Sequence, residues 1–320
     1  MNRFVVAGLA AALAVAGLAA QAQEKKQLVF VVNGASDFWK LAEAGVKKAQ
    51  GELGSGYDMS LRYPAQATAA LQNALMDDLV AAGADAIMIS SVDPKTSTDA
   101  FNKIAAQVPL FTTDSDAPQS NRVAYIGSSN TDAGVQAGEL AVKALPKGGK
   151  CMGFVGLLGA DNAKERIAGF KKAVEGHKID LVDVRGDDID FARARSNVDD
   201  VLAANPDITC MVGFYSYNSP KIYEALQAAG KLGQITVVAF DEDPVTLGAV
   251  KEGSFAGTVV QQPFEWGYQG MKLMAAYLGG DKSKIPADKL IIIPTKVIDK
   301  GNVDAFKADL KAKIDSVSGS

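Results

Sequence analysis

Short apolar runs and longer amphipathic segments alternate along the chain from Leu28 onward. The runs fall at 28–33, 59–63, 86–90, 109–113 and 123–127, and the amphipathic segments at 38–53, 66–82 and 96–107. Short, continuously apolar runs are typical of parallel strands buried on both faces, and the helical periodicity between them is typical of covering helices. The alternation therefore predicts βαβ units, that is, an α/β fold with a doubly wound parallel sheet.

The same pattern starts again at Lys150. The second series of strands is expected at 150–156, 180–186, 209–214, 235–240 and 257–262, with helices at 161–176, 190–204, 216–229 and 244–252. The two series also share a local motif, because the fourth run of each ends in Asp-x-Asp followed closely by Pro ("FTTDSDAP" and "VAFDEDPV"). Each series has the length of an ordinary domain. We therefore expect two similar lobes.

The C-terminal part continues neither series in a simple way. The segment 265–280 is expected to be a helix, 289–298 a strand that contains a proline, and 302–316 a charged amphipathic helix. An arrangement that returns one of these segments to each lobe makes the chain pass between the lobes more than once. The expected connection is therefore a hinge of several segments.

The first 22 residues have the pattern of a secretory signal peptide. Arg3 precedes an apolar run from Phe4 to Ala20, and an Ala-Gln-Ala site ends at Ala22. A membrane anchor is the alternative, but the run is short and rich in alanine and glycine. We expect cleavage near Ala22 and export to the periplasm.

The two cysteines, Cys151 and Cys210, each occupy the second position of an expected strand. In an exported chain they could form a disulfide if the two strands are neighbours. Two buried thiols are the other interpretation, and the sequence by itself favours that one.

Several classes of function find little support in the composition. A net charge of −4 gives no basic face for DNA or RNA. The chain has one histidine, His177, which offers neither a histidine metal cluster nor a well-placed triad. Because no P-loop or dinucleotide-binding motif is present either, we expect no metal, no cofactor and no catalytic residue. A glycoside-processing enzyme that uses Asp114 and Asp241 as paired carboxylates remains an alternative.

Polar and aromatic side chains follow the expected strands. In open parallel sheets, ligands bind beyond the carboxyl ends of the strands. Carboxylates, amides and one arginine exchange hydrogen bonds with hydroxyl groups, and aromatic rings cover apolar C–H faces. The set therefore predicts a neutral ligand with many hydroxyl groups. It comprises Asn33, Ser36, Asp37, Phe38, Trp39, Asp114, Ser115, Asp116, Asp161, Asn162, Arg166, Asp190, Phe191, Tyr215, Tyr217, Asn218, Asp241, Glu242, Asp243, Gln261 and Gln262.

At these positions the chain resembles the periplasmic sugar-binding proteins of the ribose-binding type. The motifs that carry the resemblance are "FVVNGASDFWKLAEAG", "VPLFTTDSD", "ADNAKERIAGF", "DIDFARA", "GFYSYNSPKIYEAL", "VVAFDEDP" and "GTVVQQP". The resemblance covers about residues 27–300. It implies two flavodoxin-like lobes, 23–126 plus 263–293 and 127–262 plus 294–320, joined by three crossovers near 126–128, 261–263 and 293–296.

The resemblance also implies which side chains bind the ligand. Asp114, Arg166 and Asp241 are expected to hold hydroxyl groups, while Phe191 and either Phe38 or Trp39 enclose the sugar ring. Ser115 stands where ribose-binding relatives often have arginine, so we expect it to set the ligand preference. The expected ligand-binding residues are Asn33, Asp37, Phe38, Trp39, Asp114, Ser115, Arg166, Phe191, Asn218, Asp241 and Gln261.

The function that the resemblance implies is capture of a neutral monosaccharide or polyol between closing lobes. The binding protein, expected to be a monomer, would deliver its ligand to an ABC permease in the inner membrane, and a chemoreceptor is a possible second partner. Alternatives are a binder of a furanose signal such as autoinducer-2, the secreted enzyme above, and a sugar-responsive transcription regulator. A regulator would need a DNA-binding headpiece where the signal peptide stands.

Overall fold

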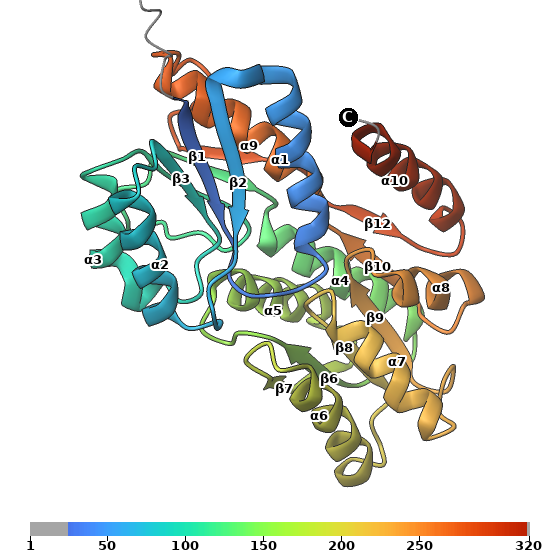
Figure 1. Cartoon of the computed structure of the whole chain (residues 1–320). Helices are drawn as coiled ribbons and strands as arrows, with labels where there is room; N and C mark the ends of the chain where they lie inside the picture. The colour runs from blue at the N-terminus through green and yellow to red at the C-terminus, as the bar shows by residue number, and fades with distance from the viewer. Residues whose placement is uncertain (1–24, 319–320) are drawn as a thin grey trace, which may run out of the picture.

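The computed structural model describes residues 25–318, which form two lobes (Figure 1). The first lobe is built on a six-stranded sheet of order β11-β5-β4-β3-β1-β2, in which all the strand pairs are parallel. Its strands are β1 Lys26–Val31, β2 Tyr57–Arg62, β3 Ala86–Ile89, β4 Leu110–Thr112, β5 Tyr125–Gly127 and β11 Leu290–Ile292. The expected first series of strands is confirmed.

The second lobe repeats this plan with the order β12-β10-β9-β8-β6-β7. Here the edge strand β12 runs antiparallel to β10, and the other pairs are parallel. The strands are β6 Gly149–Val155, β7 Ile179–Gly186, β8 Cys210–Gly213, β9 Thr236–Phe240, β10 Gly257–Val260 and β12 Lys296–Ile298. The two sheets confirm the predicted α/β class and the two similar lobes.

Helices cover both sheets, close to where the sequence predicts them. They are α1 Trp39–Leu53, α2 Ala69–Ala81, α3 Pro94–Ala105, α4 Asn130–Ala144, α5 Asp161–Val174, α6 Phe191–Ala204, α7 Asn218–Ala228, α8 Pro244–Glu252, α9 Pro263–Leu278 and α10 Val303–Ser318, with a short 3₁₀ turn at Gly54–Gly56. No helix among residues 25–318 is both long and apolar enough to cross a membrane.

The helix α4 is absent from the sequence-based prediction. Its segment is rich in alanine and glycine, so its apolar stripe is weak. It forms because it packs closely on α5: a Cβ added at Gly134 would lie 2.2 Å from the backbone oxygen of Arg166. This contact fixes the backbone of α5 beside the cleft.

The segment expected as one strand over 289–298 is two strands in two sheets. β11 pairs with β5 in the first lobe, and β12 pairs with β10 in the second. Pro294 lies between them, where it interrupts no ladder of backbone hydrogen bonds. The chain thus passes between the sheets three times, after β5, after β10 and between β11 and β12. This confirms the predicted three-crossover hinge.

The last helix, α10, contacts both lobes. Val303 and Phe306 pack into the core of the second lobe, while Lys313 forms an ion pair with Glu265 of α9 at 2.9 Å. In Figure 1, α9 lies with α1 in the first lobe, and α10 lies near α1 and α8.

The two cysteines form a disulfide, so the interpretation as free thiols is wrong. Cys151 of β6 is the register partner of Cys210 of β8 on the neighbouring parallel strand. Both side chains are fully buried. The sequence placed each cysteine on a strand but did not give the strand order that makes β6 and β8 neighbours.

The signal peptide expected over residues 1–22 lies outside the described residues.

Candidate functional site between the lobes

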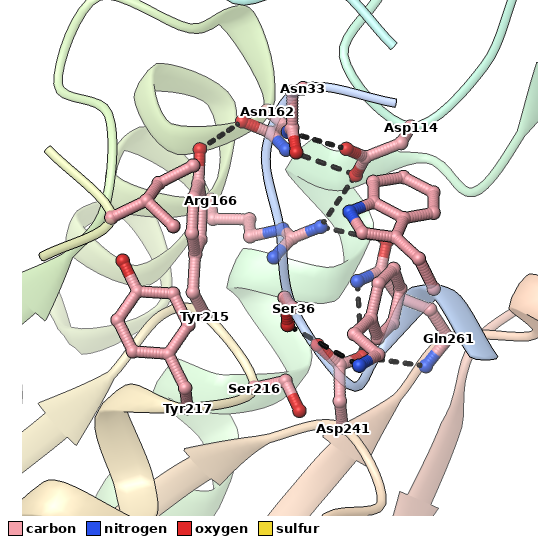
Figure 2. Close-up of a pocket in the computed structure, with 13 residues that line it drawn as sticks. Asn33, Ser36, Asp114, Asn162, Arg166, Tyr215, Ser216, Tyr217, Asp241 and Gln261 are labelled. Carbon is pink, nitrogen blue, oxygen red and sulfur yellow. Dashed lines mark hydrogen bonds and ion pairs between the residues drawn. The ribbon is translucent and has the colours of Figure 1, made fainter. Parts of the chain in front are cut away.

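A cavity of about 370 Å³, including its open mouth, lies between the lobes at the carboxyl ends of their strands (Figure 2). Its position follows from the parallel sheets, because the loops after the strands all meet at this edge. Its lining residues are Asn33, Ser36, Phe38, Trp39, Asp114, Asn162, Arg166, Ile189, Tyr215, Ser216, Tyr217, Asp241 and Gln261.

Asp114 lies two residues after the end of β4 and is buried, with 3% of its surface exposed. One carboxylate oxygen, Oδ2, accepts hydrogen bonds from Ser90 at 2.7 Å and Asn33 at 3.3 Å, both in the first lobe. The other, Oδ1, accepts from Asn162 at 2.9 Å and Arg166 at 3.3 Å, both in the second lobe. Burial raises the pKa of Asp114 above its ordinary value, and Arg166 and the hydrogen bonds offset part of that rise.

Arg166 is held by acceptors on several segments and is 1% exposed. Its Nε donates to Asn130 at 3.0 Å, and its Nη1 donates to the backbone oxygen of Phe214 at 2.8 Å. Its Nη2 donates to Gln261 at 2.7 Å as well as to Asp114. The guanidinium also lies over the ring of Phe240, 4.9 Å from its centroid. A planar donor fixed in this way suits recognition of oxygen acceptors at defined positions.

Asp241 directly follows β9 and corresponds in the second lobe to Asp114 in the first. Its Oδ1 accepts from the Gln261 side chain at 3.0 Å, and burial is the main cause that raises its pKa to about 6. Both aspartates have left-handed backbones, with φ of 54° at Asp114 and 66° at Asp241. Such values are uncommon outside glycine and concentrate at functional sites. The shared sequence motif thus corresponds to a shared backbone geometry.

Aromatic rings form the apolar part of the wall. Phe38 and Trp39 come from the first lobe, and Tyr215 and Tyr217 come from the second. Trp39 is 2% exposed and packs edge-to-face on Phe30, so it belongs to the core as well as to the cavity. The hydroxyl of Tyr215 donates to Asn162 at 2.7 Å. Figure 2 shows Tyr215 and Tyr217 on one side of the Arg166 guanidinium.

Seven of the expected ligand-binding residues line this cavity, and four do not. The seven are Asn33, Phe38, Trp39, Asp114, Arg166, Asp241 and Gln261. Asp37 points into solvent and pairs with Lys40 at 2.8 Å. Phe191 begins α6 at the surface, 43% exposed, with its ring against Tyr217.

The other two residues outside the cavity support its walls. The hydroxyl of Ser115 accepts from the backbone N–H of Asp161 at 3.2 Å, which is a contact between the lobes. Asn218 accepts from the Tyr215 N–H at 3.1 Å and donates to buried Asp187 at 2.8 Å.

The expected set omits six of the lining residues. They are Ser36, Asn162, Ile189, Tyr215, Ser216 and Tyr217. Three of them, Tyr215, Ser216 and Tyr217, closely follow β8. The strand-end rule includes Ser36, Asn162, Tyr215 and Tyr217 without selecting them. Ile189 carries no such signal, because its place depends on a left-handed backbone with φ of 61° that is rare for a β-branched residue.

No group of three or more potential metal-ligating side chains occurs within the part of the chain that the structure describes. The side chains that line the cavity offer hydrogen bonds to oxygen groups, enclosed by aromatic faces.

The family profile of the periplasmic binding protein domain matches residues 28–282. The chain belongs to this family. The resemblance inferred from the sequence is confirmed. Individual proteins are also similar to this periplasmic binding protein over most of its length. The ribose import binding protein RbsB of Salmonella typhimurium is 29% identical over 299 residues, which cover 92% of this chain and 99% of that protein.

Two solved structures of ABC transporter solute-binding proteins are similar to this chain over most of its length. An ABC transporter solute-binding protein from Burkholderia graminis, in complex with D-arabinose, matches with a TM-score of 0.81 and 29% identity over 88% of this chain and 97% of that one. Another from Agrobacterium vitis, with bound D-fucose, matches with a TM-score of 0.81 and 25% identity over 88% and 98%.

Proposed function

We propose that this periplasmic binding protein captures a neutral monosaccharide or polyol between its lobes and delivers it to an ABC importer. The observation that carries the proposal is the buried network of Asp114, Arg166, Gln261 and Asp241. The network draws on both lobes and the hinge, beneath aromatic walls. The relatives are named as binding proteins for sugars, which supports a binding function rather than catalysis.

The charge of the network favours a neutral ligand. Of the two buried carboxyl groups, Asp114 pairs directly with the single guanidinium of Arg166, and Asp241 is connected to it through Gln261. An acidic sugar or a sugar phosphate would add a negative charge to this pair, and a buried like charge is costly. Hydroxyl groups can donate to the carboxyl oxygens and accept from Arg166 without that cost.

Closure of the lobes would trap the ligand. The described conformation is closed, because Asp114 and Ser115 of the first lobe bond to Arg166 and Asp161 of the second. An apolar cluster near the cleft adds contacts between the lobes: Val92 and Ala67 of the first lobe pack with Leu157, Ala160 and Ile189 of the second. A ligand shifts the population toward this state only by its differential affinity for it.

The proposal also covers the cellular location of the protein and its protein partners. The protein would act as a monomer in the periplasm after removal of residues 1–22. There it would present its closed lobes to a permease in the inner membrane, and a chemoreceptor is a second candidate partner. XylFII, a protein of the same fold, has been solved in a complex with LytSN.

The test is a thermal-shift screen followed by calorimetry. The panel contains pentoses, hexoses, deoxyhexoses, polyols and a furanose signal. A ligand at 100 times its dissociation constant should add about 2.7 kcal/mol to the free energy of unfolding. Asp114→Ala should abolish the shift, and the exposed Asp309→Ala should keep it. The proposal fails if nothing in the panel binds, or if the chain turns over a glycoside.

A further inference from the structure

A second, larger hollow continues outward from the central cavity. It encloses about 1240 Å³, including space open to solvent, and shares Ser36, Phe38, Ser216 and Tyr217 with the central cavity. Because the two spaces have four lining residues in common, they adjoin at these side chains, which we call the neck. Ser216 and Tyr217 lie on the side of the cavity away from Asp114 in Figure 2. We call the outer space the outer groove.

Both lobes and the last helix form the outer groove. Its wall includes Asp37, Lys40 and Leu41 of the first lobe, Glu242 and Asp243 of the second, and Leu310 and Ile314 of α10. A ligand that lay in this groove would contact each part of the molecule that closure brings together.

Glu242 is a buried carboxyl group in the wall of the outer groove. The residue is 7% exposed, it lines the groove, and its Oε2 has no hydrogen-bond partner. A buried polar atom without a partner is costly, so such atoms point to a missing ligand or water. Burial first, and then the neighbouring Asp241, raise the pKa of Glu242 well above its ordinary value. A neutral carboxyl group can both donate to and accept from a hydroxyl group.

The other charges of the groove are largely balanced. Asp37 pairs with Lys40, and Glu224 pairs with Lys221, each at 2.8 Å. Asp243 caps α8 by accepting from the Val245 N–H at 2.8 Å. The groove therefore does not select strongly for a cation, and a neutral group with hydroxyls fits it better.

Aromatic side chains give the groove an apolar face. The ring of Phe191 is 43% exposed, and its centroid lies 4.7 Å from the centroid of the Tyr217 ring. Phe38 of the first lobe also lines the groove, at the neck. An exposed aromatic ring and a buried carboxyl group that line one groove suit a sugar ring, which has an apolar C–H face and a hydroxyl edge. Phe191 does not line the central cavity, but it does line the outer groove.

We propose that the outer groove holds a second sugar ring, so that the ligand is a disaccharide or glycoside whose first ring lies in the central cavity. Glu242 hydrogen-bonds a hydroxyl of the second ring, and Phe191 packs on its C–H face. This inference rests on the proposed sugar-binding function and makes the ligand larger than a monosaccharide.

The test compares matched ligands by calorimetry on the full mature chain. D-ribose, D-arabinose, D-galactose, D-glucose and myo-inositol are measured first. For each sugar that binds, both methyl glycosides and disaccharides with that ring at the non-reducing end follow. At least one disaccharide should bind as tightly as its free sugar or more tightly, and more tightly than the corresponding methyl glycoside, which lacks a second ring.

Variants locate the second ring. Glu242→Ala should weaken binding of the extended ligand about threefold to tenfold more than binding of the monosaccharide, as for loss of one hydrogen bond. Glu242→Gln should restore much of that difference, and Phe191→Ala, at the surface, gives a second probe should Glu242→Ala fold poorly. Glu139→Ala and Val182→Ala, on exposed surfaces outside the groove, are the matched controls.

The outcomes separate this inference from the proposed function. If monosaccharides bind and every extended ligand fails, the second ring is wrong and the sugar-binding function stands. The inference also fails if both groove variants weaken monosaccharide and extended ligand equally. If no sugar of either size binds, both proposals are wrong.

Discussion

Arg166 Nη2 lies 3.3 Å from Asp114 Oδ1, and this ion pair joins the two lobes across the cleft. Asp114 follows the strand β4 of the first sheet, and Arg166 lies one turn into the helix α5 of the second lobe. Both side chains are almost fully buried. The pair is therefore complete only when the lobes are closed.

Arg166→Ala should weaken binding of the sugar identified by the screen about hundredfold or more. Closure would leave the Asp114 carboxylate buried without its cation, which costs about 3 kcal/mol or more. Calorimetry measures the loss. Arg195→Ala, which removes a partly exposed pair with Asp199 in α6, should leave the affinity unchanged. Near-normal affinity in Arg166→Ala would contradict the assignment.

Ser115→Ala should weaken the binding of every sugar by a similar factor. The Ser115 hydroxyl contacts the Asp161 N–H of the other lobe and does not line the cavity, so its loss disfavours closure rather than one ligand. One neutral hydrogen bond corresponds to about threefold to tenfold in affinity. The readout is the ratio of dissociation constants for two sugars. A changed ratio would favour the prediction from sequence that Ser115 sets ligand preference.

Gly34→Ala should hinder closure, because the added Cβ would lie 2.6 Å from Ile189 Cδ1 of the other lobe. Overpacking of this kind costs about 1–3 kcal/mol, and the low end is expected here because Cδ1 ends a side chain that can rotate, so the affinity should fall about fivefold. The unliganded protein should keep its melting temperature if its lobes can open. Gly34→Ala combined with Ile189→Ala should bind more tightly than Gly34→Ala alone, and additive losses would rule out this clash.

The stability of the protein should depend on the pH through Asp187, which is buried and accepts from Tyr217 and Asn218. Burial is the main cause that raises its pKa from 3.8 to about 6. The folded state then binds this proton more tightly than the unfolded state, so the free energy of unfolding falls as the pH rises from about 4 through about 6.

Asp187→Asn removes that dependence. The difference between the free energies of unfolding of Asp187→Asn and wild type should shift in favour of the variant by up to about 3 kcal/mol between pH 4 and pH 7. Urea titrations at several pH values measure it. The lost hydrogen bonds add a constant offset, so the slope with pH is the test, and a flat difference would contradict the raised pKa.

Removal of the disulfide should destabilise the second lobe. The cysteines are 59 residues apart, and closing a loop of that length corresponds to about 4 kcal/mol in the chain-entropy account. Thiol titration of the denatured protein should find no free thiol before reduction and two after it. Cys151→Ala with Cys210→Ala should lower the melting temperature, whereas Met152→Leu, a buried control, should lower it far less. Two free thiols before reduction would contradict the bond.

The local sequence determined most of the secondary structure and the edge of the sheets where the site lies. Apolar runs such as 28–33 and 235–240 form strands because their side chains are buried on both faces. The paired Asp-x-Asp motifs identified Asp114 and Asp241 because parallel strands bring their carboxyl ends to one edge. The Ala- and Gly-rich helix α4 was missed because its signal lies in its contact with α5.

The tertiary structure decided what the residues near that edge do. Asp37 and Phe191 lie close in sequence to the expected site, but the path of their loops turns them outward, toward solvent and the outer groove. Ser115 became a contact between the lobes, and the two cysteines became a disulfide, because partners far away in sequence were brought beside them. Local pattern fixes which way a strand or helix faces, whereas these contacts depend on strand order and on how two lobes meet, which no short stretch of sequence encodes.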